Sequence, residues 1–257
     1  MIENIEPLTL AILGGVALVA GFIDAVAGGG GMLTVPALLS LGLPPHIALG
    51  TNKLAATFAS STAAWTYYRK LLFSPSFWKR SFIATFIGAV IGTLVVNQIS
   101  TMWLEKALPL IILAAAIYTI WHPHPKTAQQ SLPQVSASLY RKQWLQGSSL
   151  GFYDGLAGPG TGAFWTVSSM ALYRLDILLA SGLAKAMNFT SNMTSLVTFA
   201  ILGHINFALG LIMGLCLMVG AYIGAHSAIR FGAKFIRPIF ITVVMILAIK
   251  LAYQAWF

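Results

Sequence analysis

The feature that most constrains the fold of this chain is a series of long segments that contain no charged residue. The longest covers residues 186–229, which is 44 consecutive positions without Asp, Glu, Lys or Arg. Further charge-free runs cover 25–52, 81–104, 107–125 and 155–173. An apolar run of about 18 residues or more is typical of a transmembrane helix. The pattern therefore predicts an all-α, polytopic membrane protein.

Composition excludes a soluble globular domain, because 8% of the residues are charged and 58% are hydrophobic, whereas soluble domains carry roughly 25% charged residues. The net charge of +9 does not predict nucleic-acid binding, since the basic residues stand in ones and twos between apolar runs, where they orient helices in a bilayer. Cys216 lies inside an apolar run, and His122 and His124 have no further ligands nearby. The sequence therefore predicts neither a metal site nor a cofactor.

Charged and turn residues divide the chain into ten apolar segments, five on each side of a polar stretch. A cytoplasmic linker is expected over 122–142, between a first transmembrane repeat over 1–121 and a second over 143–257. The expected segments of the two repeats are 8–27, 32–43, 46–68, 77–97 and 102–121, then 143–157, 163–173, 178–203, 206–228 and 234–257.

Short motifs recur between the two halves at a nearly constant spacing, which indicates a duplicated unit. Gly21-Phe-Ile-Asp24 recurs as Gly151-Phe-Tyr-Asp154, Lys53 recurs as Lys185, and the glycine pair Gly88/Gly92 recurs as Gly220/Gly224. The glycine pairs have the small-xxx-small spacing of packed membrane helices. We expect them to serve helix packing and not the site.

An odd number of segments per repeat places the second copy upside down in the membrane. Of the 15 basic residues, Lys53 and Lys185 lie within segments, Lys106 and Lys250 lie near one face, and the remaining eleven fall on the other face. Because basic loops stay in the cytoplasm, we expect both termini to be periplasmic. The prediction is a multi-pass inner (plasma) membrane protein with inverted repeats and about eight full spans plus short or broken helices near the midplane. A homo-oligomer is compatible with it.

Two segments are too short to cross the bilayer. At 1.5 Å per residue, segments 32–43 and 163–173 reach roughly 18 Å, against a hydrocarbon core of about 30 Å. Each follows a glycine-rich break, Gly28–Gly31 or Gly158–Gly162. Irregular backbone at that depth is tolerated where it lines a polar cavity, and helix N-termini attract anions. The alternative is that the glycines serve only turns or close packing.

Lys53 and Lys185 lie at equivalent depths in the two halves, where a lysine costs roughly 2.5–3.5 kcal/mol at the helix centre. Each could bind a substrate anion, pair with the aspartate of its own repeat, or extend toward the interface. Asp24 and Asp154 are candidates to pair with the lysines or to carry protons. The complete set of candidate substrate-binding residues is Gly28, Gly29, Gly30, Gly31, Asn52, Lys53, Gly158, Gly160, Thr161, Gly162, Lys185, Asn188 and Asn192.

Asp24 followed by Gly28-Gly-Gly-Gly-Met-Leu-Thr-Val-Pro36 and Leu49-Gly-Thr-Asn-Lys53 resembles the sulfite exporter TauE/SafE family of membrane transporters. Asp154-Gly-Leu-Ala-Gly-Pro-Gly-Thr-Gly162 is similar to the second repeat of that family. Pro159 and Thr161 depart from the glycine-rich pattern of the first repeat. The resemblance spans nearly the whole chain and implies transport of small sulfur-containing anions, such as sulfite or sulfonates, or of organic acids.

Residues and resemblance together predict a secondary transporter, not an enzyme, that exports a small anion by alternating access, with the aspartates as candidates for proton coupling. Its partners are the small anionic substrate and the lipid bilayer. An anion channel or uniporter would use the same residues without coupling. A further alternative is an intramembrane aspartyl protease that uses Asp24 and Asp154, because two carboxylates sharing a proton perform such hydrolysis.

Overall fold

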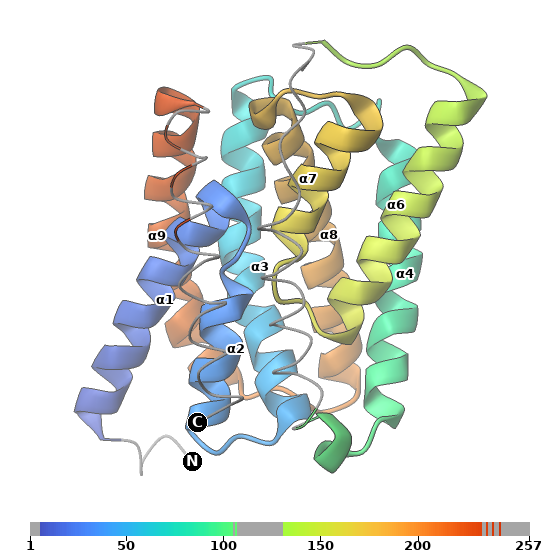
Figure 1. Ribbon diagram of the computed structural model, residues 1–257. Helices are drawn as coiled ribbons and strands as arrows, with labels where there is room; N and C mark the ends of the chain where they lie inside the picture. Colours follow the sequence, from blue (N-terminus) through green and yellow to red (C-terminus); the bar gives the residue numbers. More distant parts are fainter. Residues whose placement is uncertain are drawn as a thin grey trace.

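The computed structural model describes residues 6–104, 106 and 131–232, together with residues 235, 238 and 242. Its helices form one bundle (Figure 1). They are α1 (Pro7–Ala27), α2 (Gly31–Ser40), α3 (Pro45–Arg69), α4 (Lys79–Gln98), α6 (Ala137–Leu156), α7 (Thr161–Tyr173), α8 (Ile177–Ile201) and α9 (Phe207–Phe231). Residues 101–104 and 106 are also helical. Most of the segment expected over 102–121, and of the one over 234–257, lies outside the described residues.

The helix boundaries agree with the sequence pattern to within three residues, except at the start of α6. Helix α6 begins at Ala137, six residues before the expected start at 143, so the last part of the expected linker is helical. The hydroxyl of Ser136 caps this end by accepting a hydrogen bond from the Leu139 amide at 3.1 Å. The charged pair Arg141-Lys142 thus lies inside the helix, which extends beyond the apolar run from which its start was predicted.

The two halves of the chain are interleaved. The first helix of each half packs along the fourth helix of the other, α1 with α9 and α6 with α4, and α3 packs against α8. Equivalent helices run in opposite directions: α1 and α3 rise in Figure 1, whereas α6 and α8 descend. Helix α2 returns from the end of α1, and α7 returns from the end of α6, within the bundle. These features support the inverted repeat.

Close packing at glycines recurs in both halves. A Cβ atom on Gly88 would overlap the carbonyl oxygen of Ser148 in α6, and one on Gly220 would overlap that of Leu18 in α1. Gly88 and Gly220 are equivalent positions of the two halves, and so are Leu18 and Ser148. The prediction that these glycines serve helix packing is thus confirmed.

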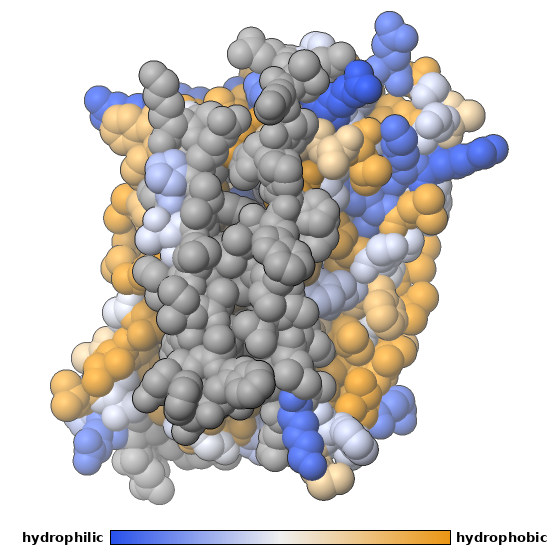
Figure 2. Space-filling model, viewed as in Figure 1, coloured by the Kyte–Doolittle hydropathy of each residue, from blue (hydrophilic) through white to orange (hydrophobic). Residues whose placement is uncertain are grey.

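Three of the described helices, α1, α4 and α9, are long and apolar enough to cross a membrane by themselves. Helices α3, α6 and α8 are also long, but they carry buried polar side chains toward the interior, among them Lys53, Asp154 and Lys185. In Figure 2, hydrophobic residues occupy the sides of the visible, non-grey surface and hydrophilic residues gather toward its two ends. This distribution fits a multi-pass protein surrounded by lipid.

Two histidines meet at the turn between α8 and α9. The rings of His204 in this turn and His46 in the first turn of α3 have centroids 5.4 Å apart. The Nδ1 atom of His204 is buried and has no hydrogen-bond partner among the described residues. Burial lowers the pKa of His204 below its usual value, and the neighbouring His46 lowers it further.

Acid is expected to weaken this corner of the fold. Because the folded-state pKa of His204 lies below the unfolded value of about 6.5, the unfolded chain binds the proton more readily, and stability falls as the pH drops through about 6.5. We expect the apparent Tm in detergent to fall on acidification, and to fall less in His204→Phe, which keeps a ring beside Phe199. Identical pH dependence in the two proteins would contradict this assignment.

Candidate functional site

Glycines with positive φ angles form both breaks in the helices. Helix α1 ends at Ala27 and is followed by Gly28, whose φ is +81°, and α2 starts three residues after this glycine. Between α6 and α7, Gly158 and Gly160 have φ angles of +91° and +83°. These left-handed conformations are strained for residues with a Cβ atom. The positions of both breaks were therefore correctly predicted from the sequence.

The two breaks touch each other near the middle of the bundle. The amide of Ala163 donates a hydrogen bond to the carbonyl oxygen of Gly28 at 3.2 Å. A Cβ atom on Gly28 would overlap the main chain of Gly162. Glycine at both positions thus permits the backbones of the two halves to approach, and the N-terminal ends of α2 and α7 converge on one region.

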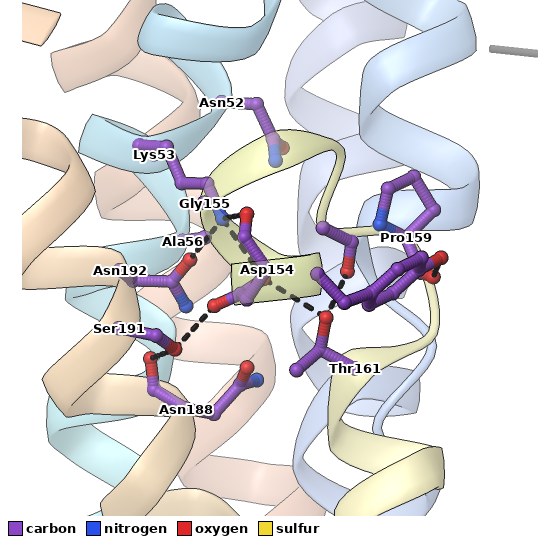
Figure 3. Close-up of polar contacts among 12 residues, drawn as sticks. Asn52, Lys53, Ala56, Asp154, Gly155, Pro159, Thr161, Asn188, Ser191 and Asn192 are labelled. Atoms are coloured by element: carbon purple, nitrogen blue, oxygen red, sulfur yellow. Dashed lines mark hydrogen bonds and ion pairs between the residues drawn. The ribbon is translucent and has the colours of Figure 1, made fainter. Parts of the chain in front are cut away.

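Lys53 extends from α3 to the end of α6, where it forms the one ion pair found among the described residues. Its Nζ atom lies 2.8 Å from Oδ1 of Asp154 and 2.5 Å from the carbonyl oxygen of the same residue. It also donates to Oδ1 of Asn192 in α8 at 3.3 Å. Figure 3 shows these contacts joining three helices. The ammonium is 1% exposed and the carboxylate residue 2%.

Two hydroxyl groups complete the surroundings of the Asp154 carboxylate. Thr161, the first residue of α7, donates to Oδ1 at 2.9 Å, and Ser191 of α8 donates to Oδ2 (Figure 3). Both carboxylate oxygens thus have partners. Such compensation is required because a buried charge without hydrogen bonds costs several kcal/mol.

The equivalent residues of the other half make different contacts. Lys185 is also 1% exposed, but it donates to the main-chain oxygen of Asp24 and not to its carboxylate. The Asp24 carboxylate is half-buried and accepts a hydrogen bond from the Gly30 amide at 3.1 Å. The two lysine–aspartate pairs, equivalent in sequence, are therefore unequal in structure.

Of the three alternatives left open for the lysines, pairing with the aspartate of the same repeat is not found in the structure. Lys53 of the first half contacts Asp154 of the second, and Lys185 of the second half contacts Asp24 of the first. The physical reason is that both breaks lie where the halves meet, against the central pair α3 and α8. Each lysine consequently links the two halves.

A small cavity lies between the breaks, with a volume of about 20 Å³. A buried site needs roughly 10–15 Å³ measured in this way to hold one water molecule. The cavity is therefore too small for a larger solute, which requires the breaks to separate. The residues that line the cavity are Asp24, Gly28, Gly31, Asn52, Lys53, Ala56, Asp154, Gly158, Gly160, Thr161, Gly162, Asn188 and Asn192.

Most of the candidate residues predicted from the sequence are brought together here, with three exceptions. Gly29, Gly30 and Lys185 do not line the cavity. The Gly30 amide donates a hydrogen bond to the Asp24 carboxylate. The Lys185 ammonium donates to the main-chain oxygen of Asp24.

Three contributing residues were missed by sequence reasoning: Thr34, Ala56 and Ser191. Thr34 donates to Oδ1 of Asn52 at 2.5 Å, Ala56 lines the cavity, and Ser191 holds Asp154. Ser191 lies three residues after Asn188, on the same helix face, so the spacing carried a usable signal. Nothing in the sequence distinguishes Ala56 from the other small residues of α3.

The contacts of Asp154 are unfavourable for an aspartyl protease. In such an enzyme, two carboxylates share one proton because they lie side by side. Here Asp154 is paired with Lys53, and both of its oxygens accept hydrogen bonds from Thr161 and Ser191. Among the described residues, the charged group against Asp154 is therefore a lysine and not a second carboxyl group.

Comparison with known proteins supports the transporter interpretation. The family model described as "Sulfite exporter TauE/SafE" matches residues 13–251. A "Probable membrane transporter protein" of Haemophilus influenzae is 38% identical over 251 residues, covering 96% of each chain. The "Probable membrane transporter protein YfcA" of Escherichia coli K12 is 34% identical over 253 residues, covering 98% of this chain and 92% of the relative. The chain therefore belongs to the sulfite exporter TauE/SafE family of membrane transporters.

Proposed function

We propose that this chain is a secondary transporter that moves a small anion through the contact between the two helix breaks. The observation that carries the proposal is the polar cavity at this contact, lined by the Lys53 ammonium and by the amides of Asn52, Asn188 and Asn192. The N-termini of α2 and α7 add the positive ends of their dipoles. These groups suit an anion once the carboxylates of Asp24 and Asp154, which also line the cavity, are neutralised by a lysine or a proton.

The proposed substrate is a sulfur oxyanion such as sulfite, a sulfonate, or a small organic acid. The family description supports the sulfur compounds and export. A substrate of this size exceeds a cavity of about 20 Å³, so binding requires the breaks at Gly28 and Gly162 to move apart. A movement that separates the breaks is the kind of motion that alternating access requires, so we favour alternating access over a permanently open channel.

The charges at the site provide a reason for proton coupling. The two lysines and the two aspartates cancel formally, so an arriving anion leaves an excess negative charge in a region of low dielectric. Protonation of Asp154 would remove that excess and would release Lys53 toward the substrate. Protonation of Asp24 would remove the excess without releasing Lys185, because Lys185 contacts the main-chain oxygen of Asp24. Transport of the anion with one proton is the expected form of coupling.

The inequality of the two lysine–aspartate pairs supports an exchange mechanism. Related repeats of opposite orientation can exchange conformations, and the exchanged state opens toward the other side. In that state Lys185 would pair with the Asp24 carboxylate, and Lys53 would leave the Asp154 carboxylate. The two ion pairs would thus form in alternation as the site changes its access.

The expected orientation in the inner membrane has the termini in the periplasm. Arg69 at the end of α3 and Arg80 at the start of α4 then lie at the cytoplasmic end, together with Arg230 near the end of α9. The turn between α8 and α9, which contains no Lys or Arg, lies at the periplasmic end. This assignment follows the preference of basic loops for the cytoplasm.

Transport in reconstituted liposomes tests the proposal. Sulfite, sulfate, thiosulfate, sulfoacetate, taurine, lactate and chloride would each be offered with and without a proton gradient, and flux followed by isotope uptake so that electroneutral transport is also detected. We expect saturable flux of one anion that responds to the gradient and falls at least about 100-fold in Lys53→Met, since removal of one partner breaks a buried pair.

Lys106→Met is the matched control, because Lys106 is exposed and its replacement removes the same charge outside the site. It should leave the flux unchanged. Flux that rises linearly with concentration and ignores the proton gradient would instead identify a channel. Equal loss of flux in both variants, or full flux in Lys53→Met, would contradict the assignment of the site.

A further inference from the structure

An apolar groove runs between α4 and α8 on the surface of the bundle. Its main part has a volume of about 720 Å³ and is lined along α4 from Phe82 to Leu94 and along α8 from Phe189 to Leu202. A second hollow of about 400 Å³ adjoins it through Phe82 and Phe189 and reaches Trp65 and Tyr68 of α3. Several lining residues are largely exposed, with Phe86 at 53% and Val197 at 51%.

The equivalent helix pair of the other half, α9 with α3, packs differently among the described residues. There the ring of Phe58 packs against Gly214 and fills the space between the two helices. At the spacing that relates Lys53 to Lys185, Gly214 corresponds to Phe82 and Phe58 to Thr190. In the other half the large residue lies on α3 and the small one on α9, whereas here the large residue, Phe82, lies on α4 and the small one, Thr190, lies on α8. Thr190 does not fill the space between α4 and α8.

One end of the groove is basic and aromatic. Trp65 and Tyr68 line this end, and the guanidinium of Arg69 lies 5.8 Å from the ring centre of Trp65. Lys70 and Lys79 follow at the end of α3 and the start of α4, and all three basic residues are exposed. No Asp or Glu occurs between residues 61 and 98, and none of these three basic residues forms an ion pair with a described residue. Asp176 at the start of α8 is one acidic residue at the same end, so this end carries a net positive charge.

We propose that the groove holds an anionic phospholipid. One acyl chain lies between α4 and α8, and the headgroup phosphate binds at Arg69, Lys70 and Lys79. Aromatic side chains at headgroup depth and basic clusters beside transmembrane helices are the features that recognise anionic lipids. A second copy of this chain is a poorer occupant, because copies share one orientation in the membrane and their basic ends would repel each other.

The test is native mass spectrometry of the full chain after equal exposure to phosphatidylglycerol and phosphatidylcholine. We expect the wild-type protein to retain phosphatidylglycerol preferentially. In Arg69→Gln with Lys70→Gln, this retention should fall about tenfold or more, since each basic residue near the surface contributes about 1 kcal/mol. Arg141→Gln with Arg230→Gln removes the same charge from exposed positions outside the groove and should retain the lipid.

A second variant tests the apolar part. Met193→Trp fills the groove at a residue that is 40% exposed, while Val219→Trp adds the same ring on α9 at a residue that is 48% exposed and outside the groove. Only Met193→Trp should lose the lipid. Equal retention of both lipids by the wild-type protein would overturn the proposal. Disulfide-linked dimers of Met193→Cys in a Cys216→Ser background would also overturn it, because they would place a second copy there. This inference does not depend on the transported anion.

Discussion

Lys53→Met is expected to lower the free energy of unfolding by about 3–5 kcal/mol, the cost of removing one partner of a buried ion pair. The substitution leaves the Asp154 carboxylate, 2% exposed, with only the hydroxyls of Thr161 and Ser191 as partners. The measurement is thermal unfolding in detergent, and the loss of the monodisperse peak with temperature is its readout.

Lys185→Met is the matched comparison, because Lys185 is equally buried but donates to a main-chain oxygen. Its loss leaves the half-buried Asp24 carboxylate with the Gly30 amide, so we expect a clearly smaller decrease. The reversed pair, Lys53→Asp with Asp154→Lys, should recover part of the lost stability. Equal decreases for the two lysine variants would show that the difference between the pairs has no energetic consequence.

Asp24→Asn and Asp154→Asn are expected to change, in opposite directions, the side of the membrane from which the cavity is accessible. Asp154→Asn removes the ion pair of the structure described above and favours the exchanged state. Asp24→Asn removes the ion pair proposed for the exchanged state and favours the one described. A change of about 1.4 kcal/mol in the balance alters the ratio of the states tenfold, and the loss of an ion pair at this burial should reach that size.

The reporter for this experiment is Ala56→Cys in a Cys216→Ser background, since Ala56 lines the cavity and carries no charge. Its reaction with a membrane-impermeant thiol reagent is measured from one side of sealed vesicles. One aspartate variant should react faster than the reporter protein and the other more slowly. Changes in the same direction for both variants would contradict the exchange mechanism while leaving the binding site untouched.

Much of the fold could be predicted from the sequence because its signals are local. The charge-free runs indicated the helices, and glycines at 28, 158 and 160 indicated the breaks, since only glycine adopts their backbone conformations without strain. The start of α6 was misplaced because the charged pair Arg141-Lys142 separates its first turn, capped by Ser136, from the apolar run. The recurrence of Lys53 and Lys185 marked both as buried and related.

The sequence by itself determined which residues form the helices, where the two breaks fall, and which polar residues are held at membrane depth, because hydropathy and glycine conformation act over a few neighbouring positions. Only the tertiary structure decided that Lys53 pairs with Asp154, 101 residues away, that Lys185 lies outside the cavity, and that α4 and α8 enclose a groove where α9 and α3 do not. These features depend on distances between helices, which are set by side-chain volumes at contacts between the two halves.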